Sequence, residues 1–193
     1  MKRAGSIGMG IGAAGLILVG AVIGYYTMDR YPRRFAVVVP GKIYRSGQPN
    51  SYALERVVED TGIRTIVNLR GEKVFKRDDR CQQEEYFAGK NAIKVVVIEF
   101  KNPPTEENIK DLLGVLDAPQ NYPILIHCKR GVDRTGVAVA VYRMERMGWT
   151  TGQAMREMLT NDFASDLRDA GSSEETIFVA KYKPKHPAPG KTP

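Results

Sequence analysis

A cysteine and an arginine separated by five residues constrain this chain more than any other feature. Cys128 and Arg134 stand between an apolar run at 122–127 and a helical pattern at 135–147, which predicts a buried strand, a tight loop and a helix. Such a loop turns backbone N–H groups inward next to the positive end of the helix, making an anion site about the size of a phosphate. These surroundings favour the thiolate of Cys128, and the planar guanidinium of Arg134 can bind two phosphate oxygens at once. The sequence therefore predicts attack of a thiolate on phosphorus, followed by hydrolysis of a phosphocysteine.

The ten residues 127–136 resemble the signature loop of the cysteine-dependent protein tyrosine and dual-specificity phosphatases. They are most similar to the atypical plant, fungal and bacterial members, and the resemblance covers roughly residues 40 to 165, including the segments 42–49 and 62–70. It implies a single α/β phosphatase domain, hydrolysis of phosphomonoesters, and neither a metal ion nor a cofactor. The expected catalytic residues are Cys128, Asp133, Arg134 and Thr135. The expected phosphate-binding residues are Lys129, Arg130, Gly131, Val132, Asp133 and Arg134. The expected supporting residues are His127, Gly136 and Arg70.

Two classes of substrate stay open at this point. Phosphotyrosine in a phosphorylated protein is the commoner substrate of the superfamily. Lys129 and Arg130 make the loop strongly cationic, which suits a polyanion such as an inositol phosphate, a pyrophosphate or a phosphoinositide head group. An inactive phosphate-binding module is a third alternative, disfavoured because nucleophile, arginine and hydroxyl are all present.

The proton donor for the leaving group is the least determined part of the site. Members of the family usually carry an aspartate on the loop that here reads 100–105, and this loop contains none. Asp133 is the best candidate, and Glu99 and Glu106 are the alternatives. Arg70, which follows a predicted strand, is expected either to touch the substrate or to pair with a nearby acid.

Alternating patterns predict an α/β domain over residues 41–170, with a mainly parallel central sheet flanked by helices. Open parallel sheets bind ligands at the carboxyl ends of their strands, where the chain has loops at 70–72, 101–105 and 128–134. The expected strands are 43–46, 63–69, 93–100 and 124–127, and the expected helices are 51–60, 82–88, 105–116, 134–147 and 150–159.

The amino terminus contains a long uncharged run. Residues 4–28 carry no charge and include seven glycines, and about 20 apolar residues are enough to span a bilayer as a helix. We therefore predict one transmembrane anchor over residues 1–28 and a juxtamembrane linker over 29–40. A cleaved signal peptide would need a shorter apolar core and a small-residue cleavage site, and a buried soluble helix with so many glycines would be weak. The glycine spacing at 8–12 and 20–24 would let two such helices approach closely, which leaves a homodimer as an open prediction.

The side of the membrane is judged from the flanking charges. Two Lys or Arg residues precede the run and three follow it closely, which taken alone favours a cytoplasmic catalytic domain. The start Met-Lys-Arg is typical of an exported signal-anchor, and the resemblance includes periplasmic bacterial relatives. We therefore expect a single-pass membrane protein whose catalytic domain faces the periplasmic side.

The net charge of +7 is concentrated at the two ends of the chain. Residues 1–46 carry seven Lys or Arg against one acid, and residues 181–193 carry four Lys and no acid, so 47–180 is net acidic. This distribution fits attraction to anionic lipid and argues against a nucleic-acid groove. We assign 171–193 to a basic, Pro/Lys-rich tail.

The cysteines and histidines are too few and too scattered for a zinc site. Such a site needs four ligands, or three and water, and Cys81, Cys128, His127 and His186 lie in unrelated segments. Cys81, in a polar stretch, is expected to be a free thiol at or near the surface. The alternative for Cys81 is a reversible disulfide with Cys128, which would protect a reactive thiolate from over-oxidation.

Overall fold

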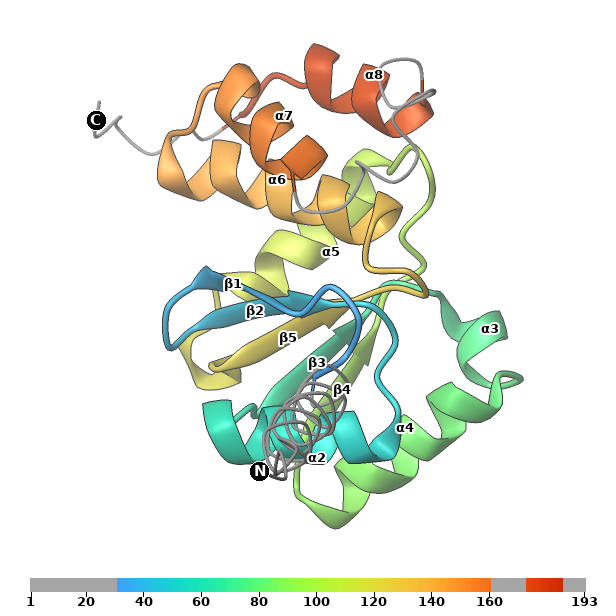
Figure 1. Cartoon of the computed structure of the whole chain (residues 1–193). Helices are drawn as coiled ribbons and strands as arrows, with labels where there is room; N and C mark the ends of the chain where they lie inside the picture. Colours follow the sequence, from blue (N-terminus) through green and yellow to red (C-terminus); the bar gives the residue numbers. More distant parts are fainter. Residues whose placement is uncertain (1–30, 161–172, 186–193) are drawn as a thin grey trace, which may run out of the picture.

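The computed structural model describes residues 31–160 and 173–185, which form a mixed sheet between two layers of helices (Figure 1). The strand order is β1-β2-β5-β3-β4. β1 is antiparallel to β2, and all other neighbours pair in parallel. The strands are β1 (Ala36–Val39), β2 (Ile43–Ser46), β3 (Thr65–Asn68), β4 (Lys94–Val97) and β5 (Ile124–His127).

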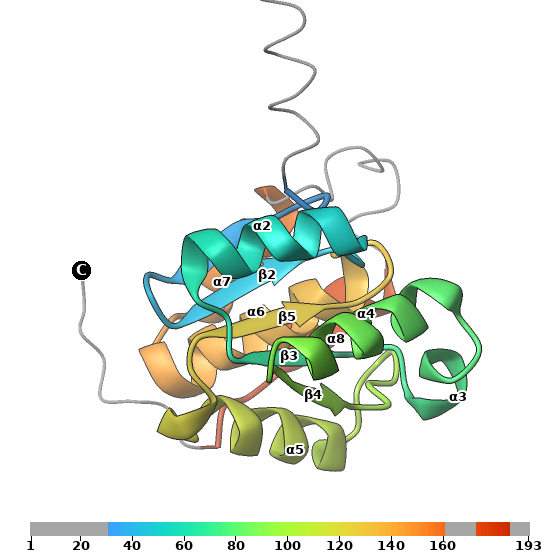
Figure 2. The same ribbon diagram turned by 90° about the horizontal axis from the view of Figure 1, so that it is seen from below.

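Helices cover both faces of this sheet, as the two orthogonal views show (Figures 1 and 2). One face carries α5 (Glu106–Leu116) and α6 (Asp133–Met147), with α7 (Thr151–Thr160) and α8 (Glu174–Lys181) outside them; the other carries α2 (Ser51–Thr61) and α4 (Asp79–Lys90). The two short helical pieces are α3 (Glu72–Phe75) and the 3₁₀ turn at Pro119–Asn121.

The central strand shows why the sheet is buried on both sides. Ile124 and Ile126 of β5 belong to the larger core beneath α5 and α6, whereas Leu125 belongs to the smaller core beneath α2 and α4. A strand with helices on both faces has a continuous apolar sequence, as β5 does. The α/β architecture with a mainly parallel sheet agrees with the sequence-based prediction.

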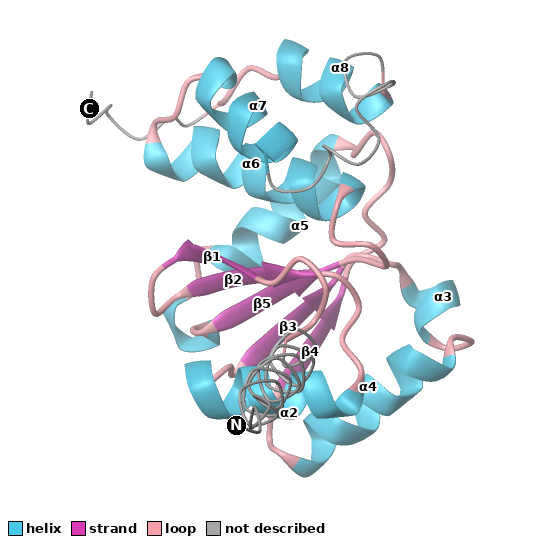
Figure 3. Ribbon diagram, in the orientation of Figure 1, coloured by secondary structure: helices cyan, strands magenta, loops and turns pink. Residues whose placement is uncertain are grey.

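Local signals fix the positions of several helices. The side chain of Asn50 accepts a hydrogen bond from the N–H of Ala53 and begins α2, and Gly62, with a φ of 67°, ends it. Thr105 and Asn108 form the capping box of α5. Because β2, β3, β4 and β5 are parallel, their carboxyl ends meet at one edge of the sheet, where the loops gather (Figure 3).

The folded part extends beyond the predicted boundaries at both ends. β1 lies inside 29–40, the range assigned to a linker, and pairs with β2. α8 lies inside 171–193, the range assigned to a tail, where Ser173 caps the helix and Val179 is fully buried.

The predicted transmembrane anchor and the single-pass membrane location are corrected. Among the helices that the structure describes, none combines the length and the apolar character needed to cross a bilayer. Residues 1–28, to which the anchor was assigned, lie outside the described part of the chain. The prediction rests on the length of one uncharged run, which makes the run a candidate for a membrane span and does not by itself establish one.

Candidate active site

The signature loop connects β5 to α6 and surrounds the thiol of Cys128. Cys128 is 2% exposed, and the backbone N–H of Gly131 donates to its Sγ at 3.3 Å. Gly131 has a φ of +77°, and a Cβ at this position would lie 2.5 Å from the backbone nitrogen of Gly47. The loop therefore needs glycine both for its left-handed backbone and for its close approach to the chain that follows β2.

The segment around β2 holds this loop from one side. The guanidinium of Arg45, itself buried, donates to the carbonyl oxygen of Gly131 at 2.8 Å. The backbone N–H of Gln48 donates to the carbonyl oxygen of Lys129 at 3.2 Å. These bonds use carbonyl oxygens of the loop, so its N–H groups stay available for an anion.

The first turn of α6 brings Arg134 and Thr135 to the same loop. A terminal nitrogen of Arg134 donates to the carbonyl oxygen of Leu69, just beyond β3, at 2.9 Å. Thr135 is fully buried, and its hydroxyl has no hydrogen-bond partner within the described residues. Gly136 lets α7 approach, because a Cβ there would lie 3.3 Å from Cγ of Met158.

The three candidate proton donors have different surroundings. Asp133 lies in the loop and accepts a hydrogen bond from Arg130 at 2.7 Å. Glu99 is exposed, and its side chain lies against Gly71. Glu106, the first residue of α5, forms an ion pair with Lys185 at 3.0 Å. Of the three, only Asp133 belongs to the signature loop itself.

Behind the loop lies a buried carboxylate that the sequence analysis did not identify. Glu84 of α4 is 2% exposed, and its Oε2 lies 2.9 Å from Nε2 of His127, the residue before Cys128. Gln48 donates to the same oxygen at 2.6 Å, and Asn68 donates to Oε1 at 3.0 Å. Burial alone would raise the pKa of Glu84, but the charge of His127 and these hydrogen bonds outweigh it, so the pKa lies below its ordinary value.

Arg70, itself buried, forms an ion pair with the partly exposed Asp78 next to this network. Its guanidinium donates to Asp78 at 2.6 Å and to Gln48 at 2.9 Å, and it lies 3.3 Å from the sulfur of Cys81. The hydrogen bond from Arg70 holds the pKa of Asp78 below its ordinary range. Cys81 is a free thiol and is fully buried rather than near the surface, and burial raises its pKa.

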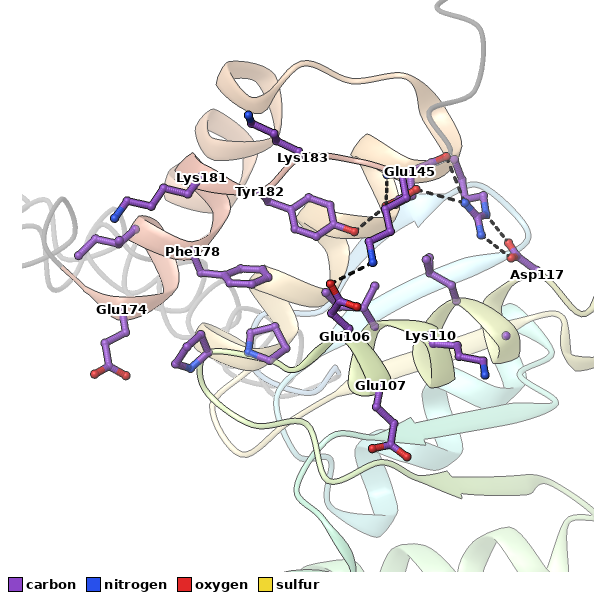
Figure 4. Close-up of a pocket in the computed structure, with 18 residues that line it drawn as sticks. Glu106, Glu107, Lys110, Asp117, Glu145, Glu174, Phe178, Lys181, Tyr182 and Lys183 are labelled. Atoms are coloured by element: carbon purple, nitrogen blue, oxygen red, sulfur yellow. Dashed lines mark hydrogen bonds and ion pairs between the residues drawn. The ribbon is translucent and has the colours of Figure 1, made fainter.

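Two cavities differ in their relation to the loop. The larger, about 1200 Å³, lies between α5 and α8 and is lined by Glu106, Phe178 and Tyr182 among others, without any residue of the signature loop (Figure 4). The smaller, about 370 Å³, is lined by Lys129 of the loop together with Gln48, Arg70, Asp78, Asp79 and Arg80. Among the residues described, no cluster of three or more His, Cys, Asp and Glu side chains is arranged to hold a metal ion.

Comparison with known proteins decides the family. A family model described as a DSP-PTPase phosphatase fused to NAD+ kinase matches residues 39–176. The chain belongs to this phosphatase family. The match confirms the resemblance inferred from 127–136.

Two curated relatives of the chain are named phosphatases. The dual specificity protein phosphatase TpbA of Pseudomonas aeruginosa is 30% identical over 138 residues, which are 67% of this chain and 56% of TpbA. The inositol diphosphatase DSP3 of Arabidopsis thaliana is 34% identical over 136 residues, which are 67% of this chain and 63% of DSP3. The chain thus spans little more than half the length of TpbA.

A solved structure shares the fold. The core catalytic domain of the PP-IP phosphatase SIW14 from S. cerevisiae superposes with a TM-score of 0.66 at 23% identity, covering 79% of this chain and 87% of that domain.

Proposed function

We propose that this protein hydrolyses phosphomonoesters through a phosphocysteine formed on Cys128. The observation that carries the proposal is the position of the thiol at the base of the signature loop, where the N–H of Gly131 points at Sγ and α6 begins at Asp133. An N–H donor and a helix N-terminus both favour negative charge. The thiolate and the phosphate it attacks are therefore held by the same backbone.

The reaction has two steps. In the first, Sγ of Cys128 attacks phosphorus, the bond between phosphorus and the ester oxygen breaks, and the leaving oxygen takes a proton from an acid. In the second, water attacks the phosphocysteine, the P–S bond breaks, and the thiolate and inorganic phosphate are released. The two steps replace one difficult displacement by two easier ones.

We assign the remaining roles to residues of the loop and of the first turn of α6. Arg134 binds two oxygens of the transferring phosphoryl group, since its fork matches their geometry. Asp133 donates the proton to the leaving oxygen. The hydroxyl of Thr135, which lacks a partner within the described residues, donates to sulfur when the thiolate departs.

The substrate is a phosphorylated protein or a polyanionic small molecule. TpbA is named a dual specificity protein phosphatase and DSP3 an inositol diphosphatase, so both classes have a relative. Lys129 and Arg130 are exposed residues of the loop, which supports an acidic substrate of either kind.

Turnover of a chromogenic aryl phosphate by the purified chain tests the proposal. Cys128→Ser should abolish release of phosphate, whereas the matched variant Cys81→Ser, which makes the same change at a buried thiol outside the loop, should keep most of it. Hydrolysis by Cys128→Ser at the parent rate would overturn the mechanism.

A further inference from the structure

The segment 31–35, which precedes β1, packs beside the signature loop although it lies outside the residues 39–176 that match the family model. The carbonyl oxygen of Arg33 accepts a hydrogen bond from the backbone N–H of Gly47 at 2.7 Å. A Cβ on Gly47 would lie 3.0 Å from the carbonyl oxygen of Arg130 and 3.3 Å from that of Arg33. The backbone after β2 is therefore packed between this segment and the loop.

Arg34 reaches across this packing to the loop itself. A terminal nitrogen of its guanidinium donates to the carbonyl oxygen of Arg130 at 3.2 Å. The backbone of Arg34 is left-handed, with a φ of 59°, a conformation that is unfavourable for residues other than glycine. Such residues persist only where the surrounding contacts hold them, and they are concentrated at functional sites. The strained backbone of Arg34 therefore suggests a function for its side chain.

The carbonyl group that Arg34 binds belongs to the same peptide unit as an N–H group that contacts the nucleophile. Gly131 directly follows Arg130, and its N–H donates to Sγ of Cys128 at 3.3 Å. In a planar trans peptide the C=O and N–H groups point in opposite directions, so a donor bound to the oxygen fixes the direction of the N–H. The same donor polarises the peptide unit and strengthens its N–H as a donor.

The two neighbouring carbonyl groups of the loop are also bonded to donors outside it. The backbone N–H of Gln48 donates to the carbonyl oxygen of Lys129 at 3.2 Å, and the guanidinium of Arg45 donates to that of Gly131 at 2.8 Å. Arg34 completes this row of three successive carbonyl groups. Of the three, the group that Arg34 binds shares its peptide unit with the N–H at the sulfur.

We propose that Arg34 is a positioning residue for the nucleophile. Its guanidinium orients and polarises the peptide unit between Arg130 and Gly131, and the N–H of this unit stabilises the thiolate of Cys128. The proposal rests on the proposed function of Cys128 and adds to it a residue outside the signature loop. Removing the side chain of Arg34 should therefore make the thiolate less stable, while the loop keeps its other donors.

The pH dependence of alkylation of Cys128 tests this role without turnover. Iodoacetamide reacts with the thiolate form of a cysteine, and mass spectrometry of the peptide that contains Cys128 gives the rate at each pH. In Arg34→Ala, the pH of the half-maximal rate should rise by about 0.3–1 unit, a fraction of what a direct hydrogen bond to a charged group contributes. Arg34→Gly should show the same rise. Because glycine accepts a left-handed backbone, this second variant should melt no lower than Arg34→Ala.

The matched control is Arg33→Ala, the same change at the adjacent arginine. The side chain of Arg33 is exposed and has no hydrogen bond or ion pair within the described residues, so this variant should keep the alkylation profile of the parent. The other charged groups of the loop and of the elements around it are the same in every chain, namely His127, Lys129, Arg130, Asp133, Arg134, Arg45, Arg70, Glu84 and Glu175.

The possible results separate the two proposals. If Arg34→Gly keeps the alkylation profile of the parent, or if Arg33→Ala shifts it as far as Arg34→Ala does, the role of Arg34 is refuted. If the parent chain fails to hydrolyse an aryl phosphate, the proposed function fails, while the alkylation comparison still decides the role of Arg34.

Discussion

Replacing Glu84 by glutamine removes the charge from the buried network behind the signature loop and keeps the size of the side chain. The two carboxylate oxygens of Glu84 accept hydrogen bonds from Gln48 and Asn68, and one of them lies 2.9 Å from Nε2 of His127. A glutamine amide offers one oxygen and one N–H₂ group. In either orientation, at least one buried donor then faces another donor.

The cost can be estimated from these contacts. A buried donor without an acceptor costs about 1–3 kcal/mol, and removing one partner of a buried ion pair costs about 3–5 kcal/mol. Because the two terms describe overlapping interactions, we expect Glu84→Gln to lower the free energy of unfolding by about 3–5 kcal/mol. At about 2–4 °C per kcal/mol for a domain of this size, the melting temperature should fall by about 6–20 °C.

The carboxylate of Glu84 also makes the difference in stability between the parent chain and Glu84→Gln depend on pH. The pKa of Glu84 is lowered in the folded state, so its stabilisation is fully present above the unfolded value of about 4.3 and is lost as the pH falls through the folded value. The gap between parent and Glu84→Gln should therefore be full near neutrality and should shrink in acid.

Urea denaturation followed by circular dichroism measures both effects. The matched control is Glu85→Gln, which changes the next residue of α4, an exposed glutamate without hydrogen bonds or ion pairs in the described chain. This control should stay within about 0.5 kcal/mol of the parent. A Glu84→Gln chain as stable as the control, or a gap that is the same at about pH 7 and about pH 3, would refute the reasoning.

Three further variants probe the loop itself. Gly131→Ala places a side chain on a left-handed residue against the backbone of Gly47, so it should destabilise the chain by about 1–3 kcal/mol or more in thermal denaturation; an unchanged melting temperature would contradict the tight loop. Arg134→Lys replaces a two-point grip by one ammonium and should lower kcat/KM on the order of 10²- to 10³-fold; retention of most activity would mean that Arg134 does not bind the phosphoryl group. Asp133→Asn should reduce turnover of alkyl phosphates by about 10²-fold or more and that of an aryl phosphate much less, because a phenolate can leave unprotonated; equal losses on both would give Asp133 a structural role.

Some elements of this fold can be predicted from local sequence patterns, and others depend on contacts between distant parts of the chain. β2 and β5 have the predicted limits. For β5 the signal is local, because its apolar run Ile-Leu-Ile defines a buried strand. β1 was missed although its sequence, Ala-Val-Val-Val, is itself apolar and β-branched, and its pairing with β2 makes it an edge strand of the sheet. Hydropathy over 4–28 predicted a membrane anchor, which the structure does not support.

The residues of the candidate site can likewise be divided into those that a local motif predicts and those that only the folded structure brings together. Cys128, Arg134 and the residues between them are contiguous, so one stretch of sequence predicts their arrangement as a loop. Glu84 reaches the site through tertiary packing from α4, and no local motif marks it. Gln48 lies in the segment 42–49 that carries the family resemblance, but its contact with Glu84 also comes from tertiary packing. A weak signal exists for Glu84, since Cys81, Glu84 and Ala88 share the helical spacing of the buried face of α4.

Direct detection of the covalent intermediate tests the central proposal. The full chain is mixed with an aryl phosphate, quenched in acid before turnover is complete, digested, and analysed by mass spectrometry for a phosphorylated cysteine. The account predicts a phosphoryl group on the peptide that contains Cys128 and on no peptide that contains Cys81, together with loss of the adduct in Cys128→Ser. Steady release of phosphate without a phosphocysteine at Cys128, or with the phosphoryl group on another residue, would contradict it.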